Sequence, residues 1–161
     1  MKIAVFDPQS LLYSLKAYEI GFIELDNIRI ELTKEITDLA AVIKKAIEEV
    51  NRNRNNDDLF KQSKIKKITE QQNELKQKQE ISSEGLKQKE VMLMEDCSAI
   101  VSEIVNDYCK TNGITVLFNQ SSVAYLDETN GESITLVLLK LLDAQDLIND
   151  YGKQLIIKYE K

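Results

Sequence analysis

Short apolar runs near both ends of the chain enclose roughly a hundred residues in which apolar and charged positions alternate with a helical period. One run is Lys2–Phe6, and another is Ile114–Phe118, followed by Val123–Asp127. Each is typical of a buried strand because it is short, apolar and bounded by turn residues. Strands from both ends share one sheet only if the chain between them goes out and returns. The pattern therefore predicts an α+β, mostly α fold, with a small β body and a long antiparallel α-helical coiled-coil hairpin.

The outgoing half of the predicted hairpin has a coiled-coil pattern. A first short helix is expected from about Gln9, with Pro8 in its first turn. Gly21 is predicted to be a break or a point of close packing. Beyond it the apolar residues recur at spacings of 3, 4 or 7, which is typical of a seam between helices. The seam residues are Phe22, Leu25, Leu32, Ile36, Leu39, Ile43 and Val50, with Arg29 and Ala46 at the remaining seam positions.

The returning half is expected to run from about Asp58 to Lys110, after a hairpin tip near residues 53–58 that is rich in Asn and Asp. Its first part is unusually polar, and Gly85 is expected to be a kink or a loosened turn. Its second part regains an apolar stripe. We therefore expect strong packing near the β body and weak packing toward the tip. The stripe comprises Leu86, Leu93, Cys97, Ile100, Ile104 and Tyr108.

Beyond the hairpin, Asn112-Gly113 is expected to end the helix and Asn130-Gly131 to form a turn. Thr135 is expected to cap a final helix from Leu136 to about Tyr151 that ends at Gly152, with a tail that docks. The predicted organisation is a β body and oligomerisation region of residues 1–21 and 113–161, and a hairpin of residues 22–112. The candidate core and oligomer residues of the body are Ile3, Val5, Val116, Phe118, Val123 and Tyr125. A three-stranded sheet is marginal by itself, so oligomerisation is expected.

Composition narrows the function. The chain has no His, which excludes His-based catalysis and His metal ligation. It has no phosphate-binding loop and no CxxC motif, and its carboxylates follow helix surfaces, so we predict neither an enzyme nor a cofactor. The net charge of −6 argues against general nucleic-acid binding. Cys97 and Cys109 are too far apart on one helix for a disulfide, and both are expected to be small buried residues.

Charge is distributed unevenly. Residues 44–78 carry a net charge of +4, which leaves −10 for the rest of the chain. Two interpretations stay open for this basic segment: a solvated helix surface, or a patch that faces acidic clients or anionic membrane head groups. Leu59, Ile65 and Ile68 are interleaved with the charges, and packing across the hairpin is the favoured role for the last two. The candidate client-binding residues are Arg52, Arg54, Phe60, Lys61, Lys64, Lys66 and Lys67.

The order of these elements resembles the Skp/OmpH family of periplasmic holdase chaperones for outer-membrane proteins. The opening Lys2–Gln9 is similar to the family's "KIAVVDxQ" strand, and Gly21 to the Gly before its long helix. Ile114–Phe118 and Val123–Asp127 are similar to its apolar and "VxYxD"-like strands, and Ile134-Thr135 to the pair that opens its C-terminal helix. Together these elements cover about 140 residues.

The resemblance implies a jellyfish-shaped homotrimer in the periplasm, in which three hairpins enclose unfolded outer-membrane β-barrel clients without ATP. The chain departs from the pattern in three respects: it is acidic overall, Met1-Lys2 leads directly into the strand without the apolar region of a signal peptide, and its tail beyond Ala144 exceeds what the pattern requires. If Met1 is the native start, the protein is expected in the cytoplasm. The alternatives are a cytoplasmic coiled-coil scaffold that binds one folded partner, and a prefoldin-like chaperone.

Overall fold

The computed structural model describes residues 1–52, 58–126 and 131–160. The described chain forms two compact units. We call residues 1–23 and 91–161 the body unit, and residues 24–90 the hairpin unit. The predicted hairpin tip near residues 53–58 lies outside the described residues except for Asp58, which begins the returning helix.

The body unit contains a three-stranded sheet in the order β2-β1-β3. Its strands are β1 (Ile3–Phe6), β2 (Val116–Asn119) and β3 (Gly131–Ser133). Both outer strands pair in parallel with β1, as strands connected by long crossovers do. The sheet thus joins the two ends of the chain, as the sequence predicts.

The third strand differs from the prediction. Residues 123–126 are not in a strand, Asp127 lies outside the described residues, and β3 lies at 131–133 instead. Gly131 begins this strand rather than forming a turn. A Cβ atom there would lie 2.4 Å from the Cδ1 atom of Leu126, so a side chain at this position would displace the end of that leucine. Backbone pairing with β1, which apolar patterning does not reveal, selects this short polar segment.

Asp7 connects the sheet to the first helix, α1 (Pro8–Tyr13). Its Oδ1 atom accepts hydrogen bonds from the backbone N–H groups of Gln9 and Ser10, at 3.0 and 3.2 Å. Pro8 needs no such partner because it has no N–H. The predicted helix start is therefore confirmed, with Asp7 as its cap.

The C-terminal region holds two helices where the sequence predicted one. They are α4 (Thr135–Ala144) and α5 (Asp150–Tyr159). Thr135 does not cap α4 with its side chain; its hydroxyl oxygen accepts a hydrogen bond from the Asp7 N–H at 3.0 Å. Gly152 lies buried inside α5 rather than ending a helix. The expected docking of the tail takes the form of α5, whose Leu155 and Ile156 pack against the core.

The core of the body unit lies where sheet, α1, α4 and the last part of α3 meet. From α3 (Asp58–Asn112), Cys97, Val101 and Val105 are buried in it. α3 ends as predicted, with Gly113 at φ +65°. The other core residues are Ala4, Leu11, Leu12, Leu15, Ile134, Leu138, Leu139, Leu142 and Ile148.

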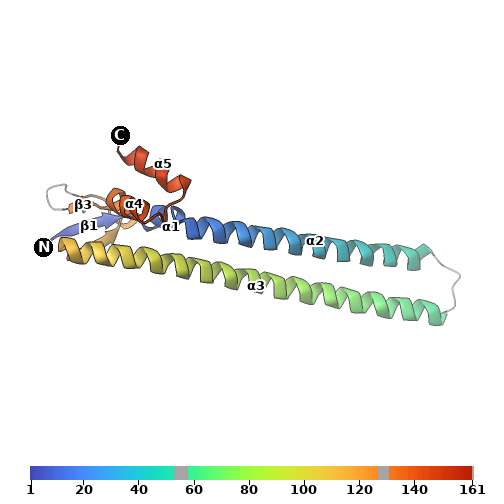
Figure 1. Cartoon of the computed structure of the whole chain (residues 1–161). Coiled ribbons are helices and arrows are strands. Elements are labelled where there is room, and N and C mark those ends of the chain that lie inside the picture. The colour runs from blue at the N-terminus through green and yellow to red at the C-terminus, as the bar shows by residue number, and fades with distance from the viewer. Residues whose placement is uncertain (53–57, 127–130, 161) are drawn as a thin grey trace. The chain divides into compact units, whose positions relative to one another are not determined.

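In the hairpin unit α2 (Lys16–Arg52) and α3 run antiparallel, as expected. Three ion pairs set their register: Arg29 with Glu90, Glu35 with Lys78, and Glu49 with Lys64. Residue numbers fall along α3 as they rise along α2, which is the signature of a hairpin (Figure 1).

The two glycines of the long helices do not break them. Gly21 lies inside α2 and packs closely on Leu93 of the body unit, where a Cβ atom would lie 2.4 Å from its Cδ1 atom. Close packing, not a break, is thus the correct one of the two predicted roles. Phe22 is exposed and stacks on Tyr18 rather than joining the buried seam. α3 also continues as one helix through Gly85.

Candidate functional site

The basic segment of the hairpin unit presents cations and apolar groups side by side. Arg52 ends α2, and Phe60, Lys66 and Lys67 are exposed near the start of α3. Arg54 lies outside the described residues. Of the seven residues singled out from the sequence, the structure therefore places six, all within the first turns of α3 or the last turn of α2.

Two of the lysines are engaged within the hairpin. The ammonium group of Lys64 lies 3.5 Å from a Glu49 carboxylate oxygen and 4.9 Å from the centre of the Phe60 ring. Lys61 is half-buried. Lys66 and Lys67 are exposed, and neither has an ion pair within the described chain. These two are consequently the cations best placed to meet an external partner.

The apolar residues of this segment likewise include both half-buried and exposed side chains. Ile68 is half-buried, as expected for packing across the hairpin, whereas Ile65 is 52% exposed, so the expected packing of Ile65 is wrong. Leu59 is exposed as well. The segment thus carries unburied apolar area beside positive charge.

Exposed apolar side chains continue along both helices of the hairpin unit. Soluble proteins tolerate single exposed apolar residues, but a repeated series on one element is typical of a contact surface. The large exposed ones of this unit, besides Leu59, Phe60 and Ile65, are Ile30, Val42, Ile47 and Ile81.

The interior side of α3 in the hairpin unit is polar at several positions. Half-buried positions recur at alternating spacings of three and four, as in a coiled coil. Polar or small residues occupy most of them. The α3 side of the seam therefore buries less apolar area than the α2 side, where Leu25 and Ile43 are buried. The half-buried residues are Lys61, Lys64, Ile68, Gln71, Leu75, Lys78, Ser82, Gly85 and Leu86.

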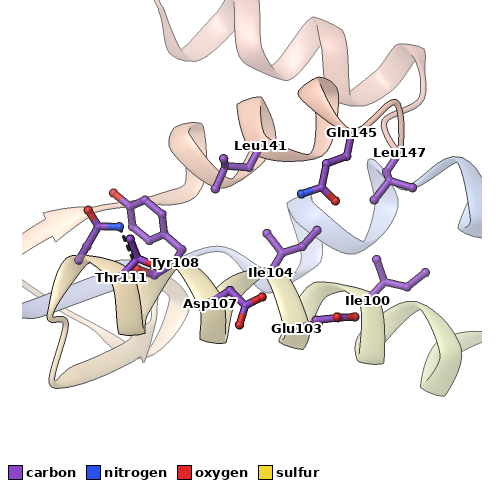
Figure 2. Close-up of a pocket in the computed structure, with 10 residues that line it drawn as sticks. Ile100, Glu103, Ile104, Asp107, Tyr108, Thr111, Leu141, Gln145 and Leu147 are labelled. Atoms are coloured by element: carbon purple, nitrogen blue, oxygen red, sulfur yellow. Dashed lines mark hydrogen bonds between the residues drawn. The ribbon is translucent and has the colours of Figure 1, made fainter.

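A groove of about 590 Å³ lies in the body unit between the last turns of α3 and the C-terminal end of α4 (Figure 2). In the close-up, Leu141 and Gln145 point toward α3, and Ile104 points toward them. The apolar lining comes from half-buried residues, and Glu103 and Asp107 add two carboxylates on α3. The lining residues are Ile100, Glu103, Ile104, Asp107, Tyr108, Thr111, Asn112, Leu141, Gln145 and Leu147.

The groove is acidic on one side. Neither Glu103 nor Asp107 has an ion-pair partner in the described part of the chain. They lie four residues apart on one helix, where like charges repel by a few tenths of a kcal/mol. The sequence shows the stripe of Ile100, Ile104 and Tyr108 but does not reveal which segment lies opposite, so this groove could not be predicted.

The body residues singled out from the sequence have mixed environments. Val5 is buried, and Ile3, Val116 and Val123 are half-buried. Phe118 is 47% exposed and Tyr125 is 83% exposed. These two aromatic side chains therefore do not belong to the core of the single chain.

The two thiols are structural in character. Burial raises the pKa of Cys97, and the nearby carboxylate of Asp96 raises it further. Burial also raises the pKa of Cys109. A raised pKa leaves less thiolate at neutral pH, which is opposite to what a reactive cysteine needs.

Within residues 1–52, 58–126 and 131–160, no cluster of three potential metal-ligating Cys or acidic side chains is present. None of the helices described in that part of the chain is both long and apolar enough to cross a bilayer.

The comparisons with known proteins agree with this architecture. Residues 2–142 match the model of the family described as outer membrane protein (OmpH-like). A crystal structure of a proposed OmpH-like outer membrane chaperone from Caulobacter crescentus CB15 is similar in fold, with a TM-score of 0.74 and 14% identity over 89% of this chain and 84% of that chain. No curated protein matches the chain. The chain belongs to the OmpH-like outer membrane protein family.

Proposed function

We propose that this protein is an ATP-independent holdase chaperone that binds unfolded outer-membrane β-barrel proteins and prevents their aggregation. Membership of the OmpH-like family and the fold shared with the Caulobacter protein support a chaperone role. The observation that carries the proposal is the hairpin unit itself, whose long helices present apolar side chains among charges and pack through a seam that is mostly polar on the α3 side.

Such a surface suits unfolded β-barrel chains. The strands of these clients alternate apolar and polar residues, so a surface that mixes both kinds makes many weak contacts with them. Each contact buries a small apolar area at about 25 cal/mol per Å². Many such contacts hold a client without fixing its structure, and no nucleotide is needed because no step requires an energy input.

Charge adds a second attraction. Lys66 and Lys67 would draw acidic segments of clients to the hairpin. The same cations also suit anionic head groups, so peripheral contact with a membrane surface belongs to the proposal. In the body unit, the groove with Glu103 and Asp107 would instead accept apolar segments that carry Lys or Arg.

We further propose that three copies assemble through the body units in the periplasm. The exposure of Phe118 and Tyr125 supports this, because large aromatic side chains are enriched where subunits meet. Three hairpins would then surround a client together, which raises its affinity through multivalency.

The test is binding of a urea-unfolded, fluorescently labelled outer-membrane β-barrel protein after dilution into buffer without nucleotide. We expect a saturable rise in fluorescence anisotropy, and no change when ATP is added. A folded, detergent-solubilised sample of the same client is the control and should not bind. Equal binding of the folded client, or none of the unfolded one, would contradict the proposal.

A charge-reversal pair isolates the electrostatic part. Lys66→Glu with Lys67→Glu should weaken capture of an acidic client about three- to thirtyfold, with a smaller effect at high salt. Lys87→Glu with Lys89→Glu is the matched control, since both residues are also exposed on α3 of the hairpin unit. An equal loss in both variants would show that only net charge matters.

A further inference from the structure

The helix that leaves the sheet is interrupted where the sequence gives no reason for it. α1 ends at Tyr13 and α2 begins at Lys16, so only Ser14 and Leu15 separate them. Residues 12–17 contain neither glycine nor proline, and Leu15 has no side-chain oxygen to cap α2. Local sequence therefore permits one continuous helix here.

The interruption is stabilised by a segment from the far end of the chain. We call residues 145–149 the strap, because they connect α4 to α5 and lie against residues 13–16. The Lys16 N–H donates to the Leu147 carbonyl at 2.9 Å, and the Asn149 N–H donates to the Ser14 carbonyl at 2.8 Å. In a continuous helix the Lys16 N–H would donate to Leu12 instead.

The side chain of Asn149 completes the strap. Its Nδ2 atom donates to the carbonyls of Tyr13 and Leu15, at 2.8 and 3.3 Å. Its Oδ1 atom accepts from the Gly152 N–H at 3.0 Å and so caps α5. One buried amide thus serves the interruption on one side and α5 on the other.

The contact is closely packed and has a charged edge. Ser14, Leu15 and Ile148 are completely buried. Lys16 pairs with Asp146 at 2.6 Å, and this hydrogen bond and charge lower the pKa of the Asp146 carboxyl. The strap, residues 145–149, lies beyond residue 142, where the match to the family model ends.

We infer that the α1–α2 junction is a two-state hinge: the strap holds it interrupted, and release of the strap lets residues 8–52 form one continuous helix. In the released state the Lys16 N–H donates to the Leu12 carbonyl. The backbone carbonyls of residues 13–15, which now accept from Asn149, then accept from N–H groups of the continuous helix. Leu11 and Leu12 of α1 are packed in the core. Straightening of the junction would therefore move the first turn of α2 with respect to that core. The strap would thereby control how firmly the hairpin is held.

The test is a backbone NMR measurement on full-length Asn149→Asp. Aspartate keeps an oxygen that can cap α5 but lacks the amide that donates to Tyr13 and Leu15. We expect the 13Cα shift of Leu15, which now bridges to Ile148, to move toward its helical value, while Ser14, already helical at φ −79° and ψ −10°, keeps its own. An unchanged Leu15 shift would overturn the inference, and so would random-coil values at both residues, since they would indicate fraying. If Asn149→Asp does not fold, Asn149→Ser, which also keeps a capping oxygen, takes its place.

Two further variants make the result specific. Proline is accepted at the first position of a helix but not in its interior. Lys16→Pro added to Asn149→Asp should therefore return the shift of Leu15 to its interrupted value; a persistent helical shift would refute the two-state hinge. Asn119→Asp is the matched control, because Asn119 caps an exposed turn through its Oδ1 atom, and it should leave the junction unchanged.

Discussion

Two glycines in helices differ in how much space surrounds them. Gly152 lies buried in α5, and a Cβ atom there would lie 2.3 Å from the Cγ1 atom of Ile148 and 2.7 Å from the Cβ atom of Ser14. Gly85 lies in α3 with no atom near the corresponding position. Both residues lie within helices, but packing favours glycine only at position 152.

Alanine at these two positions should have opposite effects. Gly152→Ala should lower the free energy of unfolding by about 1–3 kcal/mol, since α5 must shift to relieve overpacking. Gly85→Ala should raise it by about 0.5–1 kcal/mol, because alanine favours the helix. Urea denaturation of both variants checks this; a stabilising Gly152→Ala would show that α5 is not packed as described.

The buried thiol of Cys97 links stability to alkaline pH. Its pKa is raised above the ordinary value of 9.0 in the folded state, so the folded protein holds the proton more tightly than the unfolded chain does. This contribution is complete below pH 9 and is lost as pH rises through the folded pKa. Wild type should therefore lose stability more steeply than Cys97→Ala as the pH rises above 9.0 in denaturant titrations; equal slopes would contradict this.

The elements divide into those set by local pattern and those set by distant contacts. β1, the Pro8 helix start, the antiparallel hairpin and the Gly113 stop follow from patterns in adjacent residues, and the sequence predicts them correctly. β3 and the α4–α5 division do not, since backbone pairing selects β3 and the strap shapes the chain after Ala144. The groove was unpredictable for a similar reason, because its walls come from two segments, residues 100–112 and 141–147, that are distant in the sequence.

The docking of α5 can be tested with neighbouring isoleucines. Ile156 packs against the core, whereas Ile157 is 57% exposed. Ile156→Ala should cost about 1–3 kcal/mol in unfolding free energy, and Ile157→Ala less than about 0.5 kcal/mol. Thermal or urea unfolding distinguishes them; equal small costs would mean that α5 is loosely attached.

Two adjacent residues on the polar α3 side of the hairpin seam test which positions face α2. Gln71 is half-buried and Gln72 is exposed. Gln71→Leu should add apolar burial and stabilise the hairpin by about 1 kcal/mol, whereas Gln72→Leu should change little. Hydrogen exchange of α3 amides in residues 64–80 reports the difference. Faster exchange in Gln71→Leu would show that this position does not face the seam.

At the scale of the whole molecule, the proposed holdase depends on assembly. Three copies of the 18.4 kDa chain give about 55 kDa, which light scattering should report for the purified protein. Tyr125→Glu with Phe118→Glu should reduce the mass toward that of one chain, because two charges would enter a buried aromatic contact. A monomeric wild type, or a variant that keeps the full mass, would contradict the proposed subunit contact.

Aggregation of an unfolded outer-membrane β-barrel protein, followed by light scattering after dilution from urea, tests the central claim most directly. With the protein in excess and no nucleotide present, we expect the scattering to be suppressed, and the client to stay soluble and competent to fold when detergent is added. An inert protein at the same concentration should leave aggregation unchanged. If this chain in excess also leaves the scattering unchanged, it is not a holdase for such clients.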